Sequence, residues 1–252
     1  MSEEADISLG SLYPEEPRPP TPEPTVTVYE RDADITSSDW REIKIRLVGS
    51  HPLWGHHLWN AARAFASYLD HAPELYRDGY VLELGAGGGL PGLVAAKNGA
   101  KHVLLTDYPD PELVANLSHN VSENSAGDHC SVEGYIWGRS VEPLLAASGS
   151  DGFQVIILSD LVFNHSQHEA LLQTCAGCLA PSGCVLVFYT HHRPHLADRD
   201  MDFFVKARSR GWTCEQVVTR TYAPMFPEDS GSLEVRSTVH GWMLRRVETE
   251  SV

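Results

Sequence analysis

The fold of this chain is decided by the stretch YVLELGAGGGL at residues 80–90. An apolar run of strand length carries one acid, Glu83, and leads directly into a turn with four glycines and then into a helical pattern. Glycine allows tight turns and lets a ligand approach the main chain, so this unit predicts a ligand site at the carboxyl end of the strand. An ordinary tight loop is the alternative, because a glycine-rich turn alone is weak evidence.

The spacing of the glycines indicates which class of cofactor the turn could bind. The dinucleotide pattern is G-x-G-x-x-G, and its third glycine would fall at Leu90. The chain instead has G-x-G-x-G, with Gly85, Gly87 and Gly89. This spacing argues against NAD and is similar to the first motif of class I methyltransferases.

A carboxylate follows at the distance that such a site requires. The next apolar run, His102–Thr106, ends at Asp107, which lies 22 residues after Gly85. An acid about 20 residues on, at the tip of the second strand, can accept hydrogen bonds from both ribose hydroxyls of a nucleoside. Asp107 could instead cap the next helix. Asp110 is the better candidate for that cap, because Pro111 follows it and proline favours the first helical position.

Strand-like and helix-like segments alternate after residue 56. The expected strands are Tyr80–Leu84, His102–Thr106, Ser131–Ile136, Phe153–Leu158 and Cys184–Tyr189. The expected helices are His56–Leu69 and residues 90–99, 110–124, 139–148, 166–180 and 197–210. Alternation of this kind predicts an α/β fold, a doubly wound and mostly parallel sheet of seven strands. Trp212–Thr219 and Leu233–Arg245 should finish it as an antiparallel pair, and Thr25–Tyr29 should pair with Ile43–Val48.

Composition sets limits on the class of protein. The 252 residues carry a net charge of −15, which disfavours nucleic acid as a partner and favours basic proteins or amines. Residues 1–40 hold ten acids and two arginines, and six of the 16 prolines lie within residues 14–24. We therefore expect residues 1–24 to be a disordered tail and residues 25–252 to form one domain. The absence of a membrane-length apolar run and the five unpatterned cysteines favour a cytoplasmic protein, expected to be monomeric.

Three further blocks carry a resemblance to a known family. They are PLWGHHLWNA at residues 52–61, TDYPDP at residues 106–111 and SDLVFNH at residues 159–165. Together with the glycine turn they resemble the seven-strand lysine methyltransferases related to the methyltransferase-21 group. The greatest resemblance is to the fungal enzymes that methylate the N-terminus and a lysine of translation elongation factor 1-alpha, once labelled nicotinamide N-methyltransferases. The resemblance covers about residues 25–247.

The resemblance implies S-adenosylmethionine as the cofactor and a role for several residues. The implied cofactor-binding residues are Trp54 beside the methionine end, Gly85, Ala86 and Gly87 in the turn, Asp107 at the ribose, Trp137 against adenine, and Ser159 through its backbone. Asp160 is the implied catalytic residue, as an acceptor for the substrate ammonium. Relatives usually have Asp-x-x-Tyr here, whereas this chain has Phe163 in place of the tyrosine. For Trp54 and Trp137 core packing is the alternative role.

Several alternatives remain open from the sequence alone. The substrate could be a small molecule of the nicotinamide type, or the chain could bind the cofactor without catalysis. His191, His192 and His195 follow the fifth predicted strand, where they could contact substrate at the rim of the site. A metal at these histidines is a weaker possibility, because methyl transfer needs none, and no metal ligand is expected.

Overall fold

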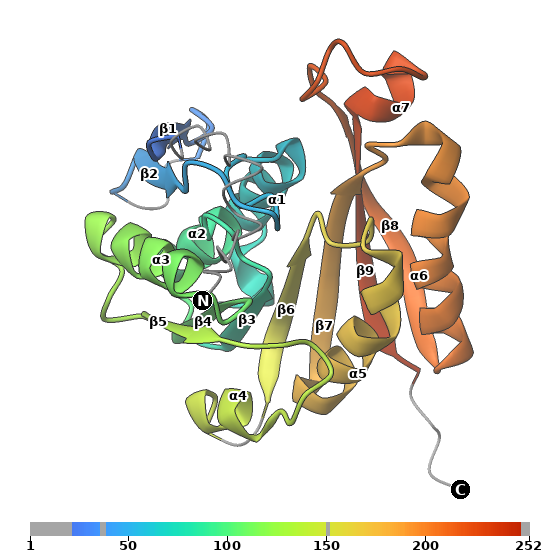
Figure 1. The fold of residues 1–252 in the computed structure, drawn as a ribbon. Helices are drawn as coiled ribbons and strands as arrows, with labels where there is room; N and C mark the ends of the chain where they lie inside the picture. The colour runs from blue at the N-terminus through green and yellow to red at the C-terminus, as the bar shows by residue number, and fades with distance from the viewer. Residues whose placement is uncertain (1–21, 36–38, 150–151, 248–252) are drawn as a thin grey trace, which may run out of the picture.

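The computed structural model describes residues 22–35, 39–149 and 152–247, and its centre is a sheet of seven strands (Figure 1). The strands are β3 (Tyr80–Leu84), β4 (His102–Asp107), β5 (Cys130–Gly134), β6 (Phe153–Ser159), β7 (Leu179–Thr190), β8 (Trp212–Thr221) and β9 (Thr238–Arg246). Their order is β5-β4-β3-β6-β7-β9-β8, and the first five are parallel. β9 lies antiparallel between β7 and β8. The predicted doubly wound sheet with a terminal antiparallel pair is confirmed.

Alternate side chains of the central strands enter two separate cores. Val81 packs into one core and Leu82 into the other, as the two-residue period of a strand requires. One face is covered by α1 (Asn60–His71), α2 (Leu90–Lys97) and α3 (Pro111–Glu123), and the other by α4 (Glu142–Ala147), α5 (His168–Cys178) and α6 (Ala197–Ser209). Short 3-10 helices lie at Pro73–Leu75, His165–Gln167 and Pro194–Leu196. The covered faces explain the unbroken apolar runs at residues 155–158 of β6 and 184–189 of β7.

A hairpin outside the main sheet lies over the glycine turn. β1 (Thr25–Glu30) pairs antiparallel with β2 (Glu42–Leu47), which confirms the predicted pairing. Asn116 and Asn120 of α3 and Asn124, directly after it, lie four residues apart on one face. Their side-chain amides form hydrogen bonds with the backbone of β2 at Lys44 and Arg46. Asn120 Nδ2 also donates to the carbonyl of residue 88 in the turn, at 3.0 Å. The asparagine row therefore satisfies the open edge of β2 and ties the hairpin to the turn.

A buried ion pair attaches the hairpin to α1. Arg31, directly after β1, donates to the Asp70 carboxylate, with Nη2 at 2.7 Å and Nε at 2.8 Å from its oxygens. Neither side chain is exposed to solvent. The guanidinium also lies 4.4 Å from the ring centre of Trp40, and Asn98 donates to Asp70 at 2.6 Å. This arrangement satisfies the charge at both ends of the pair, which burial demands.

Several predicted boundaries are wrong. The strand expected at Cys184–Tyr189 begins at Leu179, as β7, because Leu179 already pairs with Phe153 of β6; the helix expected over residues 166–180 therefore ends at Cys178. The helix expected from His56 begins at Asn60, because the chain turns at Trp54, which has a φ of 64°, and Trp59 is still extended. Leu233–Ser237, expected as strand, is the short helix α7; Ser232 caps it by accepting a hydrogen bond from the Val235 amide.

The structure describes only the last residues of the predicted N-terminal tail. Residues 1–21 of the expected tail lie outside the described residues. Pro22 contacts Gly49, where an added Cβ would overlap the Pro22 carbonyl. No helix within the described ranges is long and apolar enough to cross a membrane.

Replacing Asp70 with alanine should lower the free energy of unfolding by about 3–5 kcal/mol, the usual effect of removing one partner from a buried ion pair. Urea unfolding measures it. The control is Glu169→Ala, which removes the partner of Arg210 at the surface and should cost at most about 1 kcal/mol. Equal effects of the two substitutions would contradict the buried role of Asp70.

Candidate functional site

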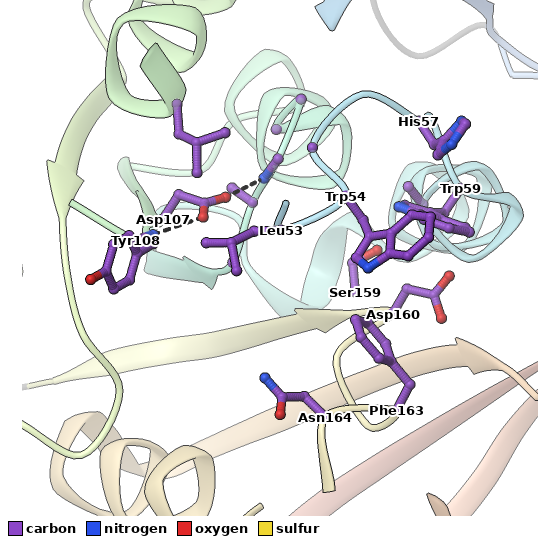
Figure 2. A pocket seen from close by; sticks show the side chains of 18 of the residues that line it. Leu53, Trp54, His57, Trp59, Asp107, Tyr108, Ser159, Asp160, Phe163 and Asn164 are labelled. Atoms are coloured by element: carbon purple, nitrogen blue, oxygen red, sulfur yellow. Dashed lines mark hydrogen bonds between the residues drawn. The ribbon is translucent and has the colours of Figure 1, made fainter. Parts of the chain in front are cut away.

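A cavity of about 590 Å³ opens at the carboxyl ends of the parallel strands (Figure 2). This is the edge at which open α/β sheets bind their ligands. The structure brings all of the sequence-predicted site residues to its lining: Trp54, Gly85, Ala86, Gly87, Asp107, Trp137, Ser159 and Asp160. Residues that are up to 106 positions apart in the chain therefore share one cavity.

The glycine turn forms the floor of the cavity. Gly85 has a φ of 60° and Gly87 a φ of 55°, in the left-handed region that glycine favours. A Cβ on Gly85 would come within 2.8 Å of Leu161 and 2.9 Å of Trp137, whereas a Cβ on Gly87 would meet nothing within 4 Å. Gly85 therefore permits close packing below the turn, and Gly87 leaves open space above it.

Asp107 stands at the end of β4 and is held by two backbone N–H groups. Gly87 N donates to Oδ2 and Tyr108 N donates to Oδ1, each at 2.7 Å (Figure 2). Burial raises the pKa of Asp107, and the two N–H groups oppose that rise by stabilising the charged form. A carboxylate has about four acceptor positions, so two remain for a ligand such as a cis-diol. Asp110 caps α3 through the amide of Glu112, as predicted.

Large apolar side chains gather around the mouth of the cavity. Leu53, Trp54, Tyr108 and Ile136 all line it, and each is 39–51% exposed. Clustered exposed apolar side chains at a concave site are typical of ligand binding. Sequence reasoning found Trp54 but missed the other three. Tyr108 could have been noticed, because it directly follows Asp107 in the TDYPDP block.

Glu83 lies behind the glycine turn in the core and is fully buried. Its Oε2 accepts a hydrogen bond from Gly92 N at 2.8 Å, while Oε1 has no partner among the described residues. Burial is the main reason that the pKa of Glu83 rises from 4.5 to about 8; the Gly92 N–H opposes the rise and Asp107 adds to it. At neutral pH the side chain is therefore mostly a neutral acid that supports the first turn of α2.

Asp160 occupies the opposite end of the cavity from Asp107 (Figure 2). It is a non-glycine residue with a φ of 59°, and its own N–H donates to the Phe188 carbonyl of β7 at 2.7 Å. Its carboxylate accepts from Thr190 N at 3.3 Å and lies 2.9 Å from His192 Nε2. The sequence left Asp160 without a histidine partner; in the structure His192 is that partner.

A second cavity of about 330 Å³ adjoins the first. Trp54, Trp59, Phe163 and Arg193 line both cavities, so they form the wall between them. Asp160 faces only the first cavity, and His192 faces only the second. The hydrogen bond between these two residues therefore links the lining of the first cavity to the lining of the second.

The three predicted rim histidines have different environments. His192 lines the second cavity, His191 is buried with Nδ1 2.7 Å from Asp200 Oδ2, and His195 is exposed. Asp200 also pairs with His165 Nε2 at 2.7 Å. Within the described ranges no group of three or more His, Cys, Asp or Glu side chains is arranged to hold a metal ion.

The geometry defines what the site can do chemically. One end offers carboxylate oxygens to a diol, the middle offers aromatic and aliphatic faces to a flat or apolar group, and the far end offers a carboxylate–imidazole pair. A tryptophan face such as that of Trp54 can also stabilise a cation. These features fit a nucleoside that carries a positively charged group, with an amine nearby.

Comparison with known proteins agrees with this geometry. A family model for lysine methyltransferases matches residues 38–210. The chain is 45% identical over 237 residues to protein N-terminal and lysine N-methyltransferase efm7 of Schizosaccharomyces pombe, with 92% of each chain covered. It is 46% identical over 250 residues to EFM7 of Candida glabrata, covering 96% of this chain and 98% of the relative. Among solved structures, M. jannaschii TYW2 in complex with AdoMet shares the fold, with a TM-score of 0.53, 13% identity and 81% and 83% of the two chains covered.

The buried Glu83 should make stability depend on pH. In the unfolded chain the side chain loses its proton near pH 4.5, but in the folded chain only near pH 8. Unfolding therefore releases a proton between these values, and the free energy of unfolding should fall as pH rises from about 5 to 8. The variant Glu83→Gln has no such proton. In urea unfolding at pH 5, 6.5 and 8, the stability of wild type relative to the variant should decline at each step; a constant difference would contradict the raised pKa.

Proposed function

The chain belongs to the lysine methyltransferase family, and from this premise we propose that it transfers methyl groups from S-adenosylmethionine to the N-terminal amine and a nearby lysine of translation elongation factor 1-alpha. Protein methylation is the activity that the family supports. The observation that carries the finer proposal is the name of the two relatives, protein N-terminal and lysine N-methyltransferase, at 45% and 46% identity. The elongation factor as target rests on the resemblance of the PLWG and TDYPDP blocks.

The cavity suits S-adenosylmethionine at each of its ends. Asp107, fixed by Gly87 N, would accept the ribose hydroxyls, and Trp137 beside Gly85 would lie against adenine. Trp54 would border the sulfonium at the other end, near Asp160 (Figure 2). The solved TYW2 structure in complex with AdoMet has the same fold, which supports S-adenosylmethionine as the cofactor.

The bound cofactor would supply a methyl group on a positively charged sulfur; an amine nitrogen can attack the methyl carbon, and the sulfur leaves as a neutral thioether. The protein must align the amine and exclude water, and the amine must have lost its proton before it reacts. An α-amine has a pKa of about 7.7–8.0 and a lysine side chain about 10.4. At neutral pH the fraction of α-amine in the neutral form is therefore more than a hundredfold larger than that of lysine. The N-terminus is therefore the easier substrate, and a lysine a few residues away would follow in the same site.

Asp160 would act on the substrate side. Its buried carboxylate lies at the end of β6, and Trp54 and Phe163 stand beside it (Figure 2). An ammonium that enters this end would meet a negative charge within a mostly apolar wall, which orients it towards the methyl group. Phe163 replaces the tyrosine that relatives usually carry, so this wall lacks a phenol oxygen.

Asp107→Ala should weaken S-adenosylmethionine binding by about 1.5–3 kcal/mol, because hydrogen bonds to a charged group would be lost. Isothermal titration calorimetry measures the affinity, and NAD should give no binding heat to wild type. The matched control is Asp110→Ala, the same change at the cap of α3, which should alter stability and leave the affinity unchanged. Equal affinity in wild type and Asp107→Ala would refute the ribose assignment.

The target is tested with purified elongation factor 1-alpha whose N-terminal amine is free, incubated with the chain and S-adenosylmethionine. Mass spectrometry of the N-terminal peptide should show added methyl groups on the α-amine and on a nearby lysine. An unmodified N-terminal peptide with methylation elsewhere would refute the site. In a lysate with labelled cofactor, label only in small molecules would favour a nicotinamide-type methyltransferase, and no label at all would favour a non-catalytic binding protein.

A further inference from the structure

The hydrogen bond between Asp160 and His192 fixes which ring nitrogen of the histidine carries the proton. Asp160 Oδ2 lies 2.9 Å from Nε2, so a neutral imidazole keeps its hydrogen on Nε2 and points it at the carboxylate. Nδ1 then holds the lone pair. It has no hydrogen-bond partner among the described residues, and it is not enclosed. Orientation of an imidazole by a carboxylate is how proteins prepare a histidine to accept a proton.

His192 lines the second cavity and not the first, so it lies across the wall from the proposed cofactor site. The imidazole ring packs at 4.7 Å from the ring of Trp59, which lines both cavities. Trp54 and Phe163 lie between this second cavity and the first one, which Asp160 and Ser159 line. An amine that approaches the cofactor through the second cavity passes this ring before it reaches Asp160.

The charges around His192 come from several elements. Asp160 follows β6, Asp200 lies on α6 and Arg193 precedes the 3-10 helix at 194–196; the second cavity also contains His165 and Asp229. Burial lowers the pKa of His192, but the two carboxylates, Asp160 above all, outweigh that effect and Arg193, so the pKa is raised overall. An acceptor with a raised pKa binds a proton more strongly than free imidazole does.

We propose that His192, oriented by Asp160, takes the proton from the substrate ammonium and delivers the neutral amine to the methyl group. The inference rests on the proposed function. The N–H bond of the ammonium breaks, its proton passes to Nδ1, and its electron pair stays on the nitrogen. That pair then forms the new bond to the methyl carbon as the carbon–sulfur bond breaks towards sulfur. His192 returns its proton to water in the second cavity.

Asp160 alone is less suited to this step. One oxygen accepts the Thr190 N–H, the other faces His192, and its carboxylate is buried. It is therefore a group that orients the imidazole and stabilises the imidazolium, which makes it a positioning residue with respect to the proton. The same pair serves each round of methylation, because every methylated amine that reacts again must first lose a proton.

The test is His192→Gln, measured as kcat/KM on elongation factor 1-alpha between pH 6.5 and 9. A glutamine amide can still donate to Asp160, but it cannot accept the proton. We expect a loss of about 100-fold or more at pH 7, the usual contribution of a general base, with S-adenosylmethionine affinity unchanged. The loss should shrink towards pH 9, because the α-amine, with a pKa of about 7.7–8.0, then loses its proton to water.

The outcomes separate this inference from the function on which it rests. If wild type does not methylate the N-terminal amine, the proposed function and this inference both fail. If wild type does and His192→Gln retains its activity, or loses the same factor at every pH, only the role of His192 is overturned. His195→Gln, at an exposed position that lines neither cavity, is the control and should behave as wild type.

A second variant covers the case in which glutamine perturbs folding. His192→Ala removes the ring, and added imidazole should restore part of the activity at pH 7 in a concentration-dependent manner. Cofactor affinity measured on the same sample shows that the protein is folded. No rescue in a variant that binds cofactor as wild type does would also overturn the proposal.

Discussion

The site depends on how the ends of β3 and β4 are joined. Their parallel pairing places Glu83 beside Leu105, so the two strands end together. Ala86 N then donates to the Thr106 carbonyl, and Thr106 Oγ1 donates to the Glu83 carbonyl. The Gly87 N–H donates to the Asp107 carboxylate and so fixes it to the glycine turn. Because each of these three bonds uses at least one backbone group, the turn and the carboxylate keep one fixed separation, which is what the recognition of a rigid nucleoside requires.

The same principle organises the substrate side. β6 and β7 are parallel neighbours, with Ser159 paired to Phe188, so the residues just after both strands meet at the same edge. Asp160 and His192 come together for that reason, although 32 residues separate them in the chain. The sheet thus places one carboxylate at each end of the first cavity. One binds a neutral sugar in our proposal, and the other works through an imidazole on a cationic amine.

Much of this arrangement could be predicted from sequence because it is set by local patterns. The bounds of β3 are those expected, since four of its five residues are apolar or aromatic, as in a strand covered on both faces, and the glycines mark its end. The start of α1 could not be predicted because Trp59 offers no side-chain cap that would mark it. The helix α7 could not be predicted because apolar and polar residues alternate along its sequence, LEVRS, as they do in a strand. Asp107 was found through its spacing from Gly85. The contact of His192 with Asp160 could not be found, because it depends on which strands are neighbours and on side-chain direction.

Trp54 and Asp160 face each other near the wall between the cavities, and both hold a left-handed backbone (Figure 2). For residues with a Cβ this conformation costs on the order of 1–2 kcal/mol each. The free energy of unfolding is thus lowered at two positions whose side chains belong to neither hydrophobic core. Selection for thermal tolerance alone would replace them with glycine. Under the proposed function, their presence in this sequence is a local trade of stability against activity, at the point where the two cavities meet.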